Sequence, residues 1–137
     1  NSLYCGVDLG EGKNVDIVST AHMLGFRTGA FDVIISTECL EHDPHWEETL
    51  QNAVRMLRPG GLMVLTCATT GRPEHGTARC SPHAAPLIPW NNYYRNLTPD
   101  DLYGIPGFDD SFSTTYCVEN RDVCDLYFYG VKECLDR

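Results

Sequence analysis

Three ionisable residues, Glu38, Glu41 and His42, stand directly after an apolar run in this sequence. The run, residues 31–37 (FDVIIST), is rich in β-branched residues, which predicts a parallel strand buried on both faces. Ligands of open α/β sheets bind at the carboxyl ends of such strands. Histidine titrates near neutral pH and can take a proton from a hydroxyl or an amine. The pattern therefore predicts a ligand-binding or catalytic edge after residue 37.

A helix and a second strand must position this edge. Asp43 suits the N-cap of a helix, with Pro44 at its first position. Apolar residues then recur at helical spacing, which predicts an amphipathic helix packed on a sheet. They are Trp46, Leu50, Ala53, Val54 and Leu57. Residues 59–61 (PGG) end the helix, and residues 62–67 predict the next buried strand.

Further strands are predicted at both ends of the chain. Residues 3–9, which include Asp8, and residues 15–18 predict two short strands around a glycine-rich turn. Residues 112–117 and 123–132 predict an antiparallel hairpin. Together with the two central strands, these segments predict an α/β domain.

A long segment, residues 68–107, has little periodicity. A structureless loop of that length is uncommon unless it is functional. Thr98 followed by Pro99 predicts the start of one short helix within it.

The composition favours a small-molecule or protein substrate. The chain of 137 residues fits one domain, 1–137, with one core. Ten basic and nineteen acidic residues give a net charge of −9, which opposes binding to nucleic acid or to an anionic membrane surface. No apolar run approaches the roughly 20 residues of a membrane span, and no signal-peptide pattern is found. The sequence predicts a soluble, cytoplasmic protein.

The spacing of cysteines and histidines predicts no metal site. The seven cysteines form neither a Cys-x-x-Cys pair nor the paired Cys/His spacing of zinc sites, and most lie in or beside apolar runs, where reduced thiols act as small hydrophobes. Glu41, His42, Asp43 and His45 are close in sequence. However, Pro44 and the incoming helix constrain their directions, and their spacing matches no recognised site.

Several motifs, taken in order, resemble the class I S-adenosylmethionine-dependent methyltransferases, type 11. They are Gly-Val-Asp at 6–8, Thr-Ala-His at 20–22, the strand at 31–36, Leu-Glu-His at 40–42 and Leu-Arg-Pro-Gly-Gly at 57–61. The resemblance covers nearly the whole chain, and residues 67–77 and 93–98 look similar to a bacterial small-molecule branch. It implies a Rossmann-like, mostly parallel sheet with a C-terminal antiparallel hairpin. It also implies methyl transfer to an oxygen or nitrogen of a small acceptor.

The resemblance implies an adenosine site built from the first strands. Asp8 matches the family's acidic residue that accepts hydrogen bonds from both ribose hydroxyls, a task that suits a carboxylate. Thr20, Ala21 and His22 match the loop that holds the adenine. Thr20 stands where an aspartate is common, but its hydroxyl can still accept the adenine amino group.

The resemblance also assigns the residues after residue 36. Thr37 and Glu38 would lie near the methionine part of the cofactor, where a carboxylate balances positive charge. Glu41 and His42 are the candidates for chemistry, with His42 as a general base. Alternatively, alignment of the acceptor with the methyl group alone supplies the rate of methyl transfer, and His42 only caps or orients the following helix.

Aromatic and polar residues in the irregular segment predict an acceptor pocket. The residues are His75, Trp90, Tyr93, Tyr94 and Arg95. Apolar rings with a few polar groups are typical of small-ligand sites. The alternative is a loop that only packs its aromatic rings on the sheet.

The family's first strand and glycine-rich turn are not found in the sequence. Residues 8–12 superficially resemble that turn, but only about twenty residues separate them from residue 31, too few for the intervening elements. The chain is therefore expected to be N-terminally truncated, with apolar sheet edges exposed. Either the strand from residue 3 pairs with the strand from residue 31, or a partner fills the gap, and self-association is expected.

Two other functions remain open. One is a noncatalytic remnant that has kept the sheet and serves as an interaction module without binding S-adenosylmethionine. The other is a nicotinamide-dependent oxidoreductase, which also has an acid after its second strand. The Leu-Glu-His and Arg-Pro-Gly-Gly order favours the methyltransferase, and no Tyr-x-x-x-Lys pair supports the oxidoreductase.

Overall fold

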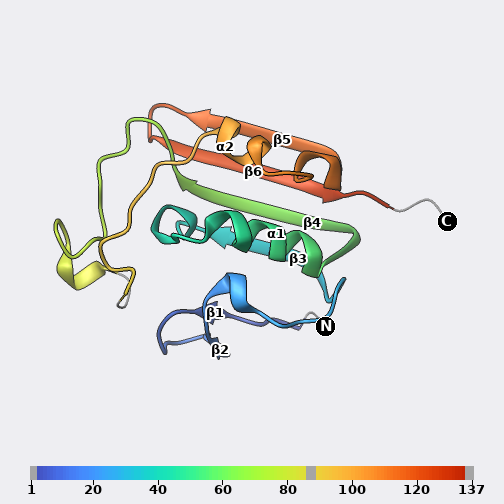
Figure 1. Cartoon of the computed structure of the whole chain (residues 1–137), viewed down its shortest axis with the longest axis horizontal. Helices are drawn as coiled ribbons and strands as arrows, with labels where there is room; N and C mark the ends of the chain where they lie inside the picture. The colour runs from blue at the N-terminus through green and yellow to red at the C-terminus, as the bar shows by residue number, and fades with distance from the viewer. Residues whose placement is uncertain (1–2, 86–88, 135–137) are drawn as a thin grey trace.

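The computed structural model describes residues 3–85 and 89–134 and shows a mixed α/β fold (Figure 1). Its main sheet has four strands in the order β3-β4-β6-β5. The bounds of the strands are Phe31–Thr37 for β3, Leu57–Ala68 for β4, Phe112–Asn120 for β5 and Asp125–Lys132 for β6. β3 and β4 are parallel, whereas β4–β6 and β5–β6 are antiparallel. The α/β class and the C-terminal hairpin are confirmed.

The helix that connects β3 to β4 begins later than predicted. α1 spans Trp46–Met56, and its N-cap is His45, not Asp43. Asp43 instead closes the preceding turn, because its Oδ1 accepts from the His45 amide at 2.8 Å and its Oδ2 accepts from Thr49 Oγ1 at 2.5 Å. The prediction that Asp43 caps the helix directly was wrong by two residues.

The prediction that the Pro-Gly-Gly segment ends α1 and precedes the strand was wrong, because α1 ends at Met56 and residues 59–61 lie within β4. Gly60 has a φ of +69°, and an added Cβ at Gly61 would lie 2.9 Å from the backbone oxygens of Arg58 and Asp32. Such a close approach requires glycine. Opposite this segment, the pairing of β3 with β4 shifts register between Phe31 and Val33.

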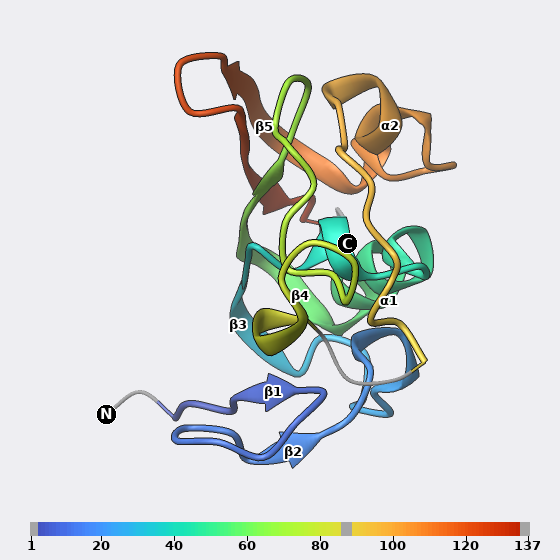
Figure 2. The same ribbon diagram turned by 90° about the vertical axis from the view of Figure 1, so that its left-hand side faces the viewer.

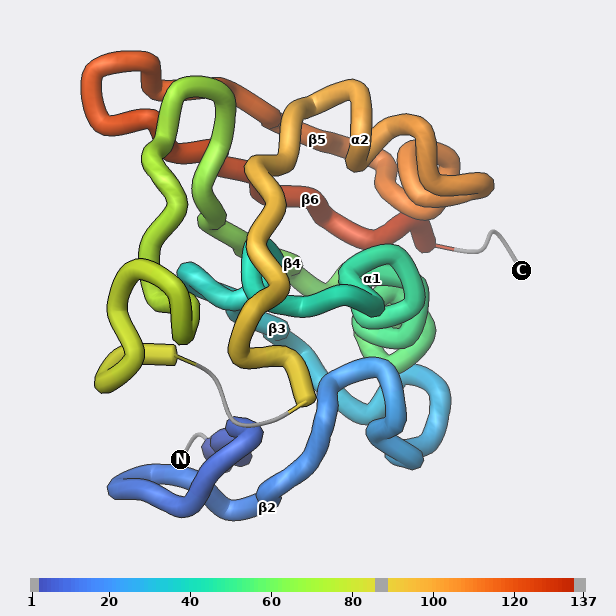
Figure 3. Tube along the Cα trace, turned by 60° about the vertical axis from the view of Figure 1, so that its left-hand side comes forward, coloured from blue at the N-terminus to red at the C-terminus, as the bar shows by residue number. Residues whose placement is uncertain are grey.

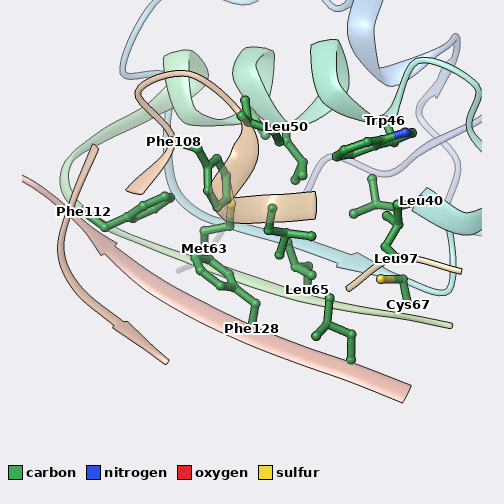
Figure 4. Packing of buried hydrophobic residues seen from close by; sticks show 14 of the residues in the cluster. Leu40, Trp46, Leu50, Met63, Leu65, Cys67, Leu97, Phe108, Phe112 and Phe128 are labelled. Atoms are coloured by element: carbon green, nitrogen blue, oxygen red, sulfur yellow. The ribbon is translucent and has the colours of Figure 1, made fainter. Parts of the chain in front are cut away.

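Two helices cover one face of the sheet and enclose the core (Figure 4). α2 spans Pro99–Gly104 and begins with the predicted cap, a capping box between Thr98 and Asp101. Strand positions alternate between faces, so every second side chain of β4 and β6 points to the helices. The core includes Leu40, Trp46, Leu50, Met63, Leu65, Cys67, Leu97, Leu102, Phe108 and Phe128.

The other face of the sheet is open in the described part of the chain. Ile35 on β3 is 66% exposed, and Val33 is 47% exposed. Tyr116 and Tyr129 pair across β5 and β6 on this face, with their rings stacked 5.4 Å apart. The prediction that the strand at 31–37 is buried on both faces was wrong, because only one of its faces meets helices.

The predicted N-terminal strands form a separate, smaller pair (Figure 2). β1 spans Val7–Asp8 and β2 spans Ile17–Val18, and the two pair in parallel with each other. Neither pairs with β3, so the predicted alternative in which the strand from residue 3 joins β3 was wrong.

Short 3-10 helices complete the described structure. They span Ala21–Met23 (η1), Leu40–His42 (η2), Pro82–Ala84 (η3) and Asp109–Ser111 (η4). Among the described residues, no helix has the length and apolar character to cross a bilayer.

Candidate functional site

The backbone turns sharply at the carboxyl end of β3. Glu38 has a φ of +49°, a conformation that non-glycine residues rarely adopt. Its amide donates to the carbonyl of Thr66 at 2.9 Å, and its Oε1 accepts from Thr66 Oγ1 at 2.9 Å. The turn leads into η2 and brings Glu41 and His42 back over the sheet edge.

Glu41 is a fully buried carboxyl group, with 0% of the residue exposed. Its Oε1 accepts from the Ala68 amide at 3.2 Å, which fixes the side chain at the end of β4. Its Oε2 has no hydrogen-bond partner among the described residues. Burial, helped by the charge of Glu38, raises the pKa of Glu41 to about 7.

His42 packs against two rings that come from a distant part of the sequence. Its ring centroid lies 5.2 Å from that of His75 and 5.4 Å from that of Tyr94. Gly76 makes room for this ring, because an added Cβ there would lie 2.9 Å from His42 Cε1. Burial, and then the charge of His75, lower the pKa of His42, so its imidazole is neutral at physiological pH.

The carbonyl of Pro73 anchors the two neighbouring rings. Tyr94 donates its hydroxyl to the Pro73 oxygen at 3.3 Å, and His75 Nδ1 lies 3.2 Å from the same oxygen. Burial is the main cause that raises the pKa of Tyr94 to about 12, so its phenol stays protonated. Both side chains are thereby held beside His42.

Residues 69–85 and 89–98, which we call the strap, carry these rings to the site. Figure 3 shows the strap running out past the ends of β3 and β4 and returning across them. The returning part is tied down by Arg95, whose amide donates to the Glu41 carbonyl at 2.9 Å, and by Leu97, whose amide donates to the Ala68 carbonyl at 3.0 Å. The irregular segment is therefore ordered by backbone hydrogen bonds to the sheet edge.

Trp90 contacts the loop predicted to hold adenine. Its ring centroid is 5.9 Å from that of His22 and 5.5 Å from that of His45, and the two histidine rings are 4.2 Å apart. His22 Nδ1 is buried and has no partner among the described residues. Among the described residues, the Trp90 ring thus makes no aromatic contact with His75 or Tyr94.

Arg95 is occupied by structural contacts. Its guanidinium donates to Asp101 and lies 5.2 Å from the ring centroid of Trp46. Tyr93 precedes it and is half-buried, and its amide donates to the Trp90 carbonyl at 2.9 Å. Neither side chain contacts His42 by any ring or hydrogen-bond interaction in the described part of the chain.

The predicted adenosine residues lie on β1 and η1. Asp8 is exposed, and its Oδ1 accepts from the Gly10 amide at 3.0 Å in a tight turn. Thr20 precedes η1 and makes no side-chain capping bond. Ala21 and His22 lie in η1 itself, and Thr37 ends β3 beside Glu38.

Sequence reasoning missed the residues that fix this loop. Asn52 on α1 donates to the carbonyls of Ala21 and Leu24, at 3.0 and 3.1 Å. Arg55, one turn further, donates to the Phe26 carbonyl at 2.6 Å. Polar residues three positions apart on an otherwise amphipathic helix were the available signal.

The polar groups of these residues suit the hydroxyl and ammonium groups of a nucleoside linked to an amino acid. An exposed carboxylate at Asp8 and another at Glu38 can accept from hydroxyl and ammonium groups. The unpartnered Nδ1 of His22 offers a buried polar atom in the adenine loop.

The comparisons with known proteins point to one class, the methyltransferases, and they support the resemblance found in the sequence. A family model described as a methyltransferase domain matches residues 6–65. This match includes most of the motifs on which the sequence resemblance rests. The match indicates S-adenosylmethionine as the cofactor, and it favours the methyltransferase over the oxidoreductase alternative.

Solved structures share the fold. A Burkholderia thailandensis 1,6-didemethyltoxoflavin-N1-methyltransferase with bound S-adenosylhomocysteine aligns with a TM-score of 0.59 and 19% identity, over 93% of this chain and 60% of that one. A Thermotoga maritima methyltransferase, described as a possible histamine N-methyltransferase, aligns with a TM-score of 0.58 and 14% identity, over 88% of this chain and 65% of that one.

Curated relatives match only part of the chain. A highly reducing polyketide synthase of Gibberella zeae is 34% identical over 64 residues, which is 47% of this chain and 2% of the synthase. A hybrid synthetase of Hapsidospora irregularis is 44% identical over 41 residues, which is 30% of this chain and 1% of that protein. The chain thus spans a very small part of these relatives.

Proposed function

We propose that this chain transfers a methyl group from S-adenosylmethionine to an oxygen or nitrogen of a small acceptor. Two observations together carry this proposal. The methyltransferase family match ends within β4, and the edge formed by β3 and β4 gathers Glu38, Glu41 and His42 beneath the strap. The N1-methyltransferase similar in fold, with its bound S-adenosylhomocysteine and 1,6-didemethyltoxoflavin, also supports the proposal.

The N-terminal elements would bind the cofactor. Asp8 would accept from both ribose hydroxyls, and residues 20–22 (Thr20, Ala21, His22) would hold the adenine. Thr37 and Glu38 would face the methionine part, where the Glu38 carboxylate balances the ammonium and sulfonium charges. The bonds from Asn52 to the adenine loop would keep that loop in place.

The strap and η2 would bind the acceptor. His75 and Tyr94 already contact the His42 ring and would line the pocket. Tyr93 would extend this wall from the returning part of the strap. Trp90, which contacts His22, would face the adenine side, and Arg95 would hold the strap through its bond to Asp101.

His42 would remove the acceptor's proton. When bound, S-adenosylmethionine supplies the methyl group, and its sulfur keeps the electron pair of the broken bond. The acceptor's oxygen or nitrogen forms the new bond to carbon, and its proton passes to a nitrogen of His42. Glu41 would orient this ring from the buried side.

A calorimetric titration of the whole chain with S-adenosylmethionine tests cofactor binding. We expect saturable binding that Asp8→Ala weakens, whereas Asp110→Ala, a similarly exposed carboxylate in η4, leaves it unchanged. No binding at millimolar cofactor would favour the noncatalytic remnant instead.

Release of S-adenosylhomocysteine over a panel of small alcohols and amines tests catalysis. We expect His42→Ala to lower kcat by about 10²- to 10⁴-fold. The matched control is His83→Ala, an exposed histidine of η3. An unchanged kcat in His42→Ala would mean that alignment of the cofactor with the acceptor, and not proton removal by His42, supplies the rate.

We also propose that the chain associates through the outer edge of β3. Within the described residues this edge has no neighbouring strand, and exposed Val33 and Ile35 lie beside it. Unpaired edges of this kind favour pairing with another chain. Size-exclusion chromatography at high protein concentration should show more than a monomer, and a strict monomer would oppose the proposal.

The cytoplasm is the proposed location. All seven cysteines are free, which suits a reducing compartment. Fractionation of cells that express the tagged chain should place it with cytoplasmic markers, and recovery in an oxidising compartment with disulfides formed would contradict this.

A further inference from the structure

Three metal-ligating side chains converge at the sheet edge, although their sequence spacing gave no sign of it. Glu41, His42 and His75 each offer one ligand atom, and these atoms lie within 4.8 Å of one another. Two of the residues come from η2 and the third from the strap. The four residues considered from the sequence do not form this group, since Asp43 is bonded to His45 and Thr49.

We propose that Glu41, His42 and His75 bind a divalent transition-metal ion of the zinc type. Two imidazoles and a carboxylate are a common ligand set for Zn²⁺ and related ions. Three protein ligands leave at least one position open for water or a ligand oxygen. This proposal replaces the prediction, made from the sequence, that the chain has no metal site.

Unpaired buried atoms support the site independently of the clustering. Glu41 is fully buried, yet its Oε2 has no hydrogen-bond partner among the described residues, and the buried Nδ1 of His42 has none there either. Buried polar atoms in proteins are nearly always paired, because leaving them unpaired costs about 1–3 kcal/mol each. A bound cation would satisfy the carboxylate and one histidine nitrogen at once.

The surroundings of His75 match those of a metal-bound histidine. Metal-ligating histidines usually donate their second ring nitrogen to a carboxylate or a backbone carbonyl, which fixes the ring. His75 Nδ1 lies 3.2 Å from the Pro73 carbonyl oxygen and can donate to it. That bond leaves Nε2 as the ligand atom, and Gly76 allows the His42 ring to approach closely.

The inference goes beyond the proposed methyl transfer, and binding of the ion does not depend on it, whereas any role of the ion toward the acceptor rests on the proposed function. A His42 nitrogen that binds an ion has no lone pair for a proton. An ion-loaded site would therefore activate an acceptor oxygen through the open metal position rather than through His42 as a base.

Titration of the metal-free whole chain with Co²⁺, without S-adenosylmethionine, tests the site. We expect one equivalent to bind, with visible absorption of cobalt bound to nitrogen and oxygen. His75→Ala should weaken binding at least about tenfold. The control His83→Ala should bind like the unchanged chain, because His83 is exposed in η3, outside the group.

A second variant separates ligand loss from misfolding. Glu41→Gln keeps the shape of the buried side chain and should also weaken Co²⁺ binding, with circular dichroism to verify the fold. The proposal is overturned by no binding, by binding that His75→Ala leaves unchanged, or by a thiolate-to-cobalt absorption band. Cofactor titration of the same metal-free chain gives a separate answer, so failure of one proposal is distinguishable from failure of the other.

Discussion

The two faces of the main sheet are built from the same strands but have opposite environments. On the helix-covered face, Leu65 is 1% exposed and Phe128 is 2% exposed. On the open face, Ile35 is 66% exposed and Tyr116 is 51% exposed. Apolar side chains occur on both faces, so their presence alone does not tell how many faces are covered. The helices α1 and α2 make the difference.

The largest expected effect separates the two faces directly. Leu65→Ala should lower the free energy of unfolding by about 2–5 kcal/mol, because it leaves a cavity in the core. Ile35→Ala, on the open face, should change it by no more than about 0.5 kcal/mol in dilute protein. Urea denaturation of both variants measures the contrast. Equal losses would mean that another copy or segment covers the open face.

A smaller effect concerns the attachment of α1 to the sheet. Lys132 on β6 donates from Nζ to the carbonyls of Val54 at 2.6 Å and Leu57 at 2.7 Å, at the end of the helix. Lys132→Met should cost about 1.5–3 kcal/mol, since these bonds are charge-assisted. The exposed Lys13 provides the matched control, and Lys13→Met should have little effect. Thermal unfolding would contradict the contrast if both variants lost the same stability.

The cap of α2 should contribute about 1 kcal/mol and depend on pH. Thr98→Ala removes the side chain that accepts from the Asp101 amide. Burial tends to raise the pKa of Asp101, but hydrogen bonds from Thr98 and the charge of Arg95 together lower it.

The sign of the pH dependence follows from the lowered pKa. A carboxylate whose pKa is lower in the folded state stabilises the protein above its unfolded pKa of about 3.9, and the stabilisation is lost as pH falls through the folded pKa. Acid unfolding monitored by circular dichroism should therefore show less loss of stability in Asp101→Asn than in the unchanged chain. A steeper loss in the variant would contradict the assignment.

The smallest effect is expected at the exposed side of β3 and β4. Arg58 Nε lies 2.6 Å from Asp32 Oδ1, but the two side chains are 49% and 80% exposed. Asp32→Asn should cost less than about 1 kcal/mol, and the difference should shrink in high salt. Chemical denaturation at low and high ionic strength checks this, and a large salt-independent loss would show that the pair is shielded.

Local signals predicted most of the secondary structure. The Thr98–Pro99 start of α2 and the C-terminal hairpin were predicted because capping and β-strand preferences depend on neighbouring residues. The start of α1 was misplaced because Asp43 serves a turn instead. Nothing local distinguishes an aspartate that caps a helix from one that bonds to a threonine six residues later.

The site was predicted only in part. Glu38, Glu41 and His42 were predicted at the sheet edge because the strand before them is readable from its apolar residues. His75 and Tyr94 were expected near an acceptor, but their contact with His42 depends on the Pro73 carbonyl and on the return of the strap. Such contacts join residues far apart in the sequence, and no local pattern encodes them.

The sequence by itself determined the resemblance of residues 6–65 to a methyltransferase domain, the α/β class and the residues that follow β3, because motif order and strand periodicity are local properties of the chain. Tertiary structure alone decided which sheet face is covered, where β1 and β2 pair, and that Glu41, His42 and His75 converge. The physical reason is that burial and the meeting of donor atoms depend on how separate segments pack, and packing is a property of the whole fold.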